Sequence, residues 1–67
     1  MCNRIHFKSS KDAAKVQSLL VMRGYHVCVV KNGCMYEDGT IMEVGDSAFE
    51  FALQISEAFG LLATIEG

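Results

Sequence analysis

The central stretch VCVVKNGCMYEDGTIMEV, residues 27–44, decides the fold because it contains two strands and the turns between them. It opens with β-branched and small apolar residues, which are typical of a strand, and a strand is predicted over residues 25–31. Two dipeptides follow, Asn32-Gly33 and Asp38-Gly39, and both tolerate the positive φ angles of a tight hairpin turn. A second strand is predicted over residues 40–44.

The interval between the two dipeptides has two interpretations. If both turns are tight, residues 34–37 form a short additional strand and the stretch is a β-meander. If one of the turns is a loose loop, the same stretch forms a single longer hairpin. The residues favour neither interpretation over the other, so both stay open.

The residues before the hairpin predict a helix over residues 11–23. Ser9 is followed three positions later by Asp12, which resembles a capping box at a helix start. Gly24 is the residue type expected where a helix ends in a left-handed conformation. Apolar residues recur at helical spacing between these ends, and the predicted buried stripe is Ala13, Val16, Leu19 and Leu20.

The residues after the hairpin predict a second helix, opened by Asp46 and Ser47. Ser47 and Glu50 have the spacing of a capping box, in which each side chain bonds the backbone of the other residue. Gly60 closes the helix. The predicted buried stripe is Phe51, Ala52, Ile55 and Phe59, and the opposite, solvated face is Glu50, Gln54 and Glu57.

The two ends of the chain predict two more strands. Residues 3–8 alternate, with Ile5 and Phe7 on one face, and residues 61–66 alternate in the same way. The expected order is β-α-β-β-(β)-α-β in a single α+β domain, residues 1–67. Right-handed crossovers place both helices on one face of a mainly antiparallel sheet. This order resembles the ferredoxin-like (split β-α-β) architecture, which hosts many unrelated functions.

With both helices on one face, the other face of the predicted sheet is uncovered. Its composition is mixed and partly apolar, which is expected of a contact surface. By alternation this face carries Arg4, His6, Lys8, His26, Cys28, Val30, Leu62, Thr64 and Glu66.

A chain of 67 residues in which 51% are hydrophobic has more apolar surface than it can bury. Mean hydropathy is +0.24. A domain of this size buries only about 60% of the surface that its unfolded chain exposes. We therefore expect a protein partner, a homodimer, or both to cover the remaining apolar surface.

Charge is distributed unevenly along the chain although the net charge is only −2. Residues 1–33 carry six cations and one acid, a net charge of +5, whereas residues 34–67 carry seven acids and no Lys or Arg, a net charge of −7. Such asymmetry indicates a charged partner or head-to-tail association. Alternatively, the two halves interleave in one sheet and the charges mix in space.

No catalytic, cofactor or metal motif is present in the sequence. His6, His26 and Cys28 are the strongest metal candidates, but no pair of them has a diagnostic ligand spacing. The glycines occur singly at predicted caps and turns, so no phosphate-binding loop is formed. We expect no enzyme activity, no cofactor and no metal site.

Cysteine usage and hydropathy predict a cytoplasmic protein. The three cysteines, Cys2, Cys28 and Cys34, are odd in number and lack CxxC spacing, which argues against a disulfide framework. Residues 1–10 contain no apolar core of a signal peptide. No apolar run approaches the ~18 residues of a membrane span, so no membrane interaction is expected.

The leading hypothesis is a non-enzymatic protein-binding module, a small inhibitor or adaptor of the kind that phages and mobile elements encode. It would act through the exposed sheet face or through an acidic helix face that fits a basic protein. One alternative is a small-ligand or metal-sensing domain. Another is nucleic-acid binding through the basic first half, against which the pI of about 5.5 argues. The candidate partner-binding residues are Arg4, His6, Lys8, His26, Val30, Leu62, Glu43, Asp46, Glu50 and Glu57.

Overall fold

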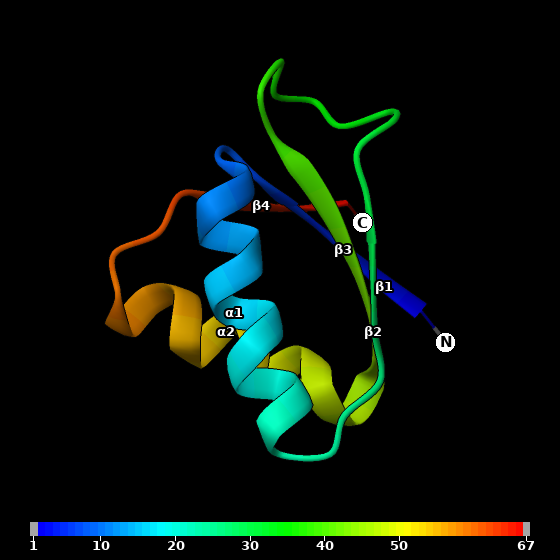
Figure 1. Cartoon of the computed structure of the whole chain (residues 1–67), viewed down its shortest axis with the longest axis vertical. Helices are drawn as coiled ribbons and strands as arrows, with labels where there is room; N and C mark the ends of the chain where they lie inside the picture. The colour runs from blue at the N-terminus through cyan, green and yellow to red at the C-terminus, as the bar shows by residue number, and fades with distance from the viewer. Residues whose placement is uncertain (1, 67) are drawn as a thin grey trace.

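The computed structural model describes the backbone of residues 2–66 and the side chains of residues 3–65, and it contains two helices and a four-stranded antiparallel sheet (Figure 1). Along the chain the elements are β1 (Cys2–Phe7), α1 (Ser10–Met22), β2 (Val27–Val30), β3 (Thr40–Gly45), α2 (Asp46–Ala58) and β4 (Ala63–Glu66). Neither of these helices is long and apolar enough to cross a membrane.

The strand order in the sheet is β2-β3-β1-β4, and all neighbouring strands are antiparallel. The central pair, β1 and β3, runs from Cys2 opposite Gly45 to Phe7 opposite Thr40. Helix α1 connects β1 to the edge strand β2, and α2 connects β3 to the other edge strand, β4. The predicted α+β fold and the β-α-β-β-α-β order are confirmed, without the additional strand.

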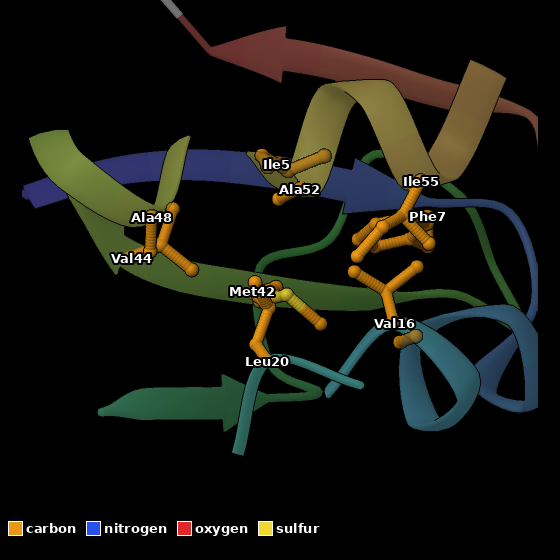
Figure 2. Close-up of a cluster of buried hydrophobic side chains, with 10 residues drawn as sticks. Ile5, Phe7, Val16, Leu20, Met42, Val44, Ala48, Ala52 and Ile55 are labelled. Carbon is orange, nitrogen blue, oxygen red and sulfur yellow. The ribbon is translucent and has the colours of Figure 1, made fainter. Parts of the chain in front are cut away.

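Both helices pack on the same face of the sheet, where they share one apolar core with β1 and β3. In Figure 2, Leu20 of α1 points toward Met42 of β3, and Ala48 of α2 points toward Val44. The buried cluster comprises Ile5, Phe7, Ala13, Val16, Leu20, Met42, Val44, Ala48, Ala52 and Ile55. Burial of this one face fixes the register of the central strands, because a shift by one residue would turn every core side chain outward.

Helix α1 lies within one residue of its predicted ends. The Ser9 hydroxyl accepts a hydrogen bond from the backbone N–H of Lys11 at 3.2 Å, which satisfies one donor of the first turn. At the other end Gly24 has a φ of 87°, the left-handed conformation expected after a helix. The predicted cap and stop of this helix are both confirmed.

Helix α2 begins at Asp46, which was predicted to open it together with Ser47, but the expected Ser47–Glu50 capping box is wrong. Its N-cap is Gly45, which provides no side-chain hydrogen bond, and Asp46 is its first residue. The reason is that β3 stays paired with β1 as far as Gly45, so the helix starts directly where the strand ends. Gly60, with a φ of 66°, ends the helix as predicted.

Of the two interpretations left open for residues 34–37, the additional strand is wrong, because residues 31–39 form a loop between β2 and β3. The single-hairpin interpretation therefore holds. The outer strands are shorter than predicted as well. The N–H of Tyr25 bonds the Leu20 carbonyl at 3.1 Å and that of Leu61 bonds the Ser56 carbonyl at 2.8 Å, so each amide completes a helix end before its strand begins.

Phe59, predicted to be buried, is 52% exposed. It is the C-cap residue of α2 and lies beyond the last helical turn that packs on the sheet. The ammonium of Lys15 sits 4.6 Å from the centroid of its ring, a cation–π contact between the two helices. An end residue therefore serves as a surface contact although its helical spacing predicts a core position.

The two halves of the chain interleave, because β1 lies between β3 and β4. Arg4 of the basic half donates from Nε to the Glu43 carboxylate of the acidic half at 3.0 Å. The charge split along the sequence is thus not a simple split in space, and the alternative in which the charges mix is supported.

Candidate functional site

The sheet face opposite the helices, called here the open face, is partly closed by the loop of residues 31–39. Alternation along the strands places His6 and Ile41 on this face, directly opposite each other on β1 and β3. Both are nevertheless buried, with exposed fractions of 2% and 3%. The imidazole Nδ1 of His6 accepts a hydrogen bond from the backbone N–H of Met35 at 3.1 Å. The loop therefore covers one end of the open face.

The same loop crosses β1 and reaches the far edge strand. The hydroxyls of Tyr36 and Thr64 are 2.7 Å apart, which joins the loop to β4. The thiol of Cys34 lies 3.8 Å from the carbonyl oxygen of Phe7, within reach of a weak hydrogen bond. These contacts hold the loop across the sheet from β2 to β4.

The burial of His6 corrects the prediction that the sheet face opposite the helices is uncovered. His6 cannot meet a partner directly while the loop is in place, since it is enclosed between the loop and the sheet. The prediction left His6 uncovered whether residues 34–37 formed a strand or part of a hairpin loop. The loop can lie over His6 because the Met35 N–H donates to the His6 Nδ1, which gives the buried imidazole nitrogen the hydrogen-bond partner that it requires.

The other sheet residues predicted to bind a partner differ from His6 in being accessible. On the open face, the Arg4 and Glu43 side chains are 49% and 27% exposed and pair with each other. Leu62 is 57% exposed just before β4, and Val30 is 39% exposed at the end of β2. Lys8 and His26 are exposed and lie outside the strands. Of these seven residues, His6 alone is buried.

The predicted acidic surface is confined to α2 and the strand before it. Glu50 and Glu57 are exposed on the side of α2 away from the core. Asp46 accepts a hydrogen bond from the side-chain amide of Asn3 at 2.9 Å, so it also helps to fix the start of α2 against β1. A carboxylate in the first turn is favourable because it faces the positive end of the helix dipole.

Metal binding finds no support in the part of the chain that the structure describes. No group of three or more His, Cys, Asp or Glu side chains there is placed to hold a metal ion. Of the three residues considered as metal candidates, His6 is buried, whereas His26 precedes β2 and Cys28 is exposed within it. Cys28 and Cys34 are free thiols.

A pocket of about 310 Å³ lies between the loop and the start of α1. Ser10, Lys31, Glu37, Asp38 and Gly39 line it. This volume is at the lower limit of small-molecule sites, which are usually lined by apolar and aromatic groups, and here the lining carries charges of both signs. The Ser10 hydroxyl is engaged with the Thr40 hydroxyl at 3.1 Å.

The outer side of β2, called here the β2 edge, is the surface that the sequence analysis missed. β2 pairs with β3 alone, and its sequence Val27–Val30 contains no charged residue. Cys28 is exposed, and Val29 and Val30 are each 39% exposed. The order of the elements could have indicated this surface, because in a split β-α-β arrangement the second strand lies at the edge of the sheet.

Comparisons with known proteins give no relative from which a function of this chain could be proposed. The functional inference therefore rests on the loop contacts, the charges and the β2 edge of the chain itself. No family model, no curated protein and no solved structure matches the sequence or the fold of this chain.

Proposed function

We propose that this chain is a non-enzymatic protein-binding module, a small inhibitor or adaptor, that binds its partner along the β2 edge. We assign it to the ferredoxin-like (split β-α-β) architecture, which the strand order β2-β3-β1-β4 and the β-α-β-β-α-β order support. In this architecture the helix-covered face forms the core. The open face and the two strand edges remain for contacts.

One observation carries the proposal: an edge strand that is uncharged, apolar and exposed on both of its faces. An edge strand presents unpaired backbone N–H and C=O groups, and these are a template for pairing with another chain. Proteins that keep such an edge free protect it with charges, proline or a bulge. The residues of β2 provide no charge and no proline, so the edge is suited to accept a strand from a partner.

The open face supports binding less well than the edge does. One end of it is occupied by the loop, and its centre carries the Arg4–Glu43 ion pair. A partner on this face would have to displace the loop or desolvate that ion pair, and both are unfavourable. We therefore place the contact at the β2 edge.

The experiment that tests the proposal compares capture by two lysine variants. Val30→Lys puts a charge on the β2 edge, and Leu62→Lys puts the same charge on a more exposed aliphatic position near β4. Each immobilised chain is incubated with lysate of the cells that make the protein, and bound proteins are quantified by mass spectrometry. Circular dichroism verifies that both variants are folded.

We expect the wild-type chain and Leu62→Lys to retain the same protein, other than the chain itself, in stoichiometric amounts, and Val30→Lys to retain at least tenfold less. If the wild-type chain retains no protein other than itself, the inhibitor or adaptor function is wrong. If Val30→Lys retains as much as the wild-type chain, the assignment to the β2 edge is wrong.

A further inference from the structure

We propose that the β2 edge pairs with the β2 edge of a second copy of this chain, antiparallel and centred on Cys28, so that the two sheets become one continuous sheet. This inference rests on the proposed function only in taking the β2 edge as the binding surface. It names the chain itself as the partner of that edge in the free protein, a partner that a foreign strand would have to displace, and it specifies the register.

Burial ends abruptly at β2 on both faces of the sheet. On the helix-covered face, Val29 is 39% exposed although Met42, opposite it on β3, is fully buried. On the open face, Val30 is also 39% exposed although its partner Ile41 is 3% exposed. A further strand beside β2 would cover both valines at once, whereas a ligand on either face would cover only one.

The two edges of the sheet differ in their protection. β4 ends at an acidic residue, Glu66. β2 contains only Val and Cys. Charged residues discourage edge-to-edge pairing. Of the two edges, β2 is therefore the one that accepts another strand.

Geometry restricts how β2 can pair with itself. In an antiparallel pair, two opposite residues either both direct their backbone N–H and C=O groups toward the partner strand or both direct them away from it. This direction alternates from one residue to the next along a strand. Residues that face each other across a self-pair must thus both be even-numbered or both be odd-numbered. For the four residues of β2, the two central solutions place Cys28 opposite Cys28 or Val29 opposite Val29.

Charge and packing favour the register centred on Cys28. The register centred on Val29 would place the cation of Lys31 opposite Val27 of the other copy. The register centred on Cys28 places Val29 opposite Val27 instead, on the helix-covered face, where Val27 already packs against the core. Cross-strand pairs of β-branched residues stabilise a sheet. This register extends the apolar core across the interface, places the exposed His26 opposite Val30 on the open face, and leaves the cation of Lys31 beyond the end of the strand.

The register makes Cys28 a reporter of the interface. Opposite residues of antiparallel neighbours have Cα atoms about 4.5–5.5 Å apart. Disulfides form between Cα atoms about 4.4–6.8 Å apart. In a chain with Cys2→Ser and Cys34→Ser, copper phenanthroline is therefore expected to join two copies through Cys28, with the electrons passing to copper and oxygen. The matched control is Leu62→Cys in a chain whose three native cysteines are serine.

Light scattering over a concentration series measures the association without oxidation. We expect a dimer for the wild-type chain and for Leu62→Lys, and at least tenfold weaker association for Val29→Lys. We expect cross-linking of the Cys28 chain to be at least tenfold faster than that of the Leu62→Cys control.

The outcomes separate the inference from the proposed function. A wild-type chain that stays monomeric overturns the inference, and edge-dependent capture of a foreign protein would then leave the proposed function standing. A dimer that resists Val29→Lys, or that does not cross-link through Cys28, also overturns the inference. An edge-dependent dimer that captures no foreign protein supports the inference and overturns the inhibitor or adaptor function.

Discussion

At the scale of single residues, Gly39, at the end of the loop over the open face, is the described glycine with the least space for a side chain. A Cβ atom at Gly39 would collide with the carbonyl oxygen of Phe7 and would lie 2.8 Å from the Cβ of Tyr36 and 2.9 Å from the Sγ of Cys34. The carbonyl belongs to β1 and cannot move without disturbing the sheet. Glycine at this position is what lets the loop lie close to β1.

We expect Gly39→Ala to lower the free energy of unfolding by about 1–3 kcal/mol, the cost typical of forcing an extra carbon into packed surroundings. Urea denaturation followed by circular dichroism measures the change. Gly45→Ala is the matched control, since a Cβ there meets no atom within 4 Å, and we expect it to change stability by roughly 0.5 kcal/mol or less. Equal stability of the two variants would contradict the close approach of loop and strand.

His6 shows where prediction from the sequence failed at this scale. Its alternation with Ile5 and Phe7 correctly placed it on the face away from the helices. Its burial depends on the Met35 amide, a contact between residues far apart in the chain. Periodicity reports which face a side chain takes, but it does not report what a loop later lays over that face.

At the scale of elements, the two helices have the same length but different starts. α1 is capped by the Ser9 hydroxyl, whereas α2 starts at Gly45 without a side-chain cap. We expect Ser9→Ala to destabilise the protein by about 1 kcal/mol, and Gly45→Ser to stabilise it by roughly 0.5 kcal/mol. Thermal unfolding measured by circular dichroism distinguishes these opposite signs.

Ser47→Ala is the control for both cap variants, because Ser47 lies inside α2 and is exposed. We expect its effect to stay within about 0.5 kcal/mol. If Ser47→Ala instead lowered the free energy of unfolding by about 1 kcal/mol, that result would support the capping box predicted from the sequence.

Local signals were sufficient for the helices and insufficient for the loop. The helix stops, Gly24 and Gly60, act through their own backbone conformation, so their effect can be read from the sequence. The turn dipeptide Asn32-Gly33 gave a correct local signal too, since Gly33 has a φ of 85°. Whether such a turn is tight depends on contacts with β1 and β4, and no local pattern encodes those contacts.

At the scale of the whole molecule, the surplus of apolar side chains predicted from composition is visible on the surface. The large hydrophobic residues that remain exposed are Val21, Met22, Val29, Val30, Met35, Phe59, Leu62 and Ile65. Composition predicted that such a surplus exists, but only the strand order places part of it on an unprotected edge.

We expect the melting temperature of the wild-type chain to rise with protein concentration, because association favours the folded state by mass action. For a domain of this size the expected rise is about 3–5 °C for each tenfold increase in concentration. Differential scanning calorimetry over two decades of concentration measures it. Val29→Lys should show a smaller rise over the same concentrations, and a flat profile for the wild-type chain would contradict self-pairing.

The interleaving of the two halves has a consequence for how the chain can be divided. A cut after Gly33 leaves two fragments, each with one central strand, one helix and one edge strand. Neither fragment can complete the sheet alone, because each central strand needs the other as its neighbour. Their net charges of +5 and −7 draw them together. The chain is thus suited to division into two peptides that fold only when they meet, so the recovery of folded structure would measure their association.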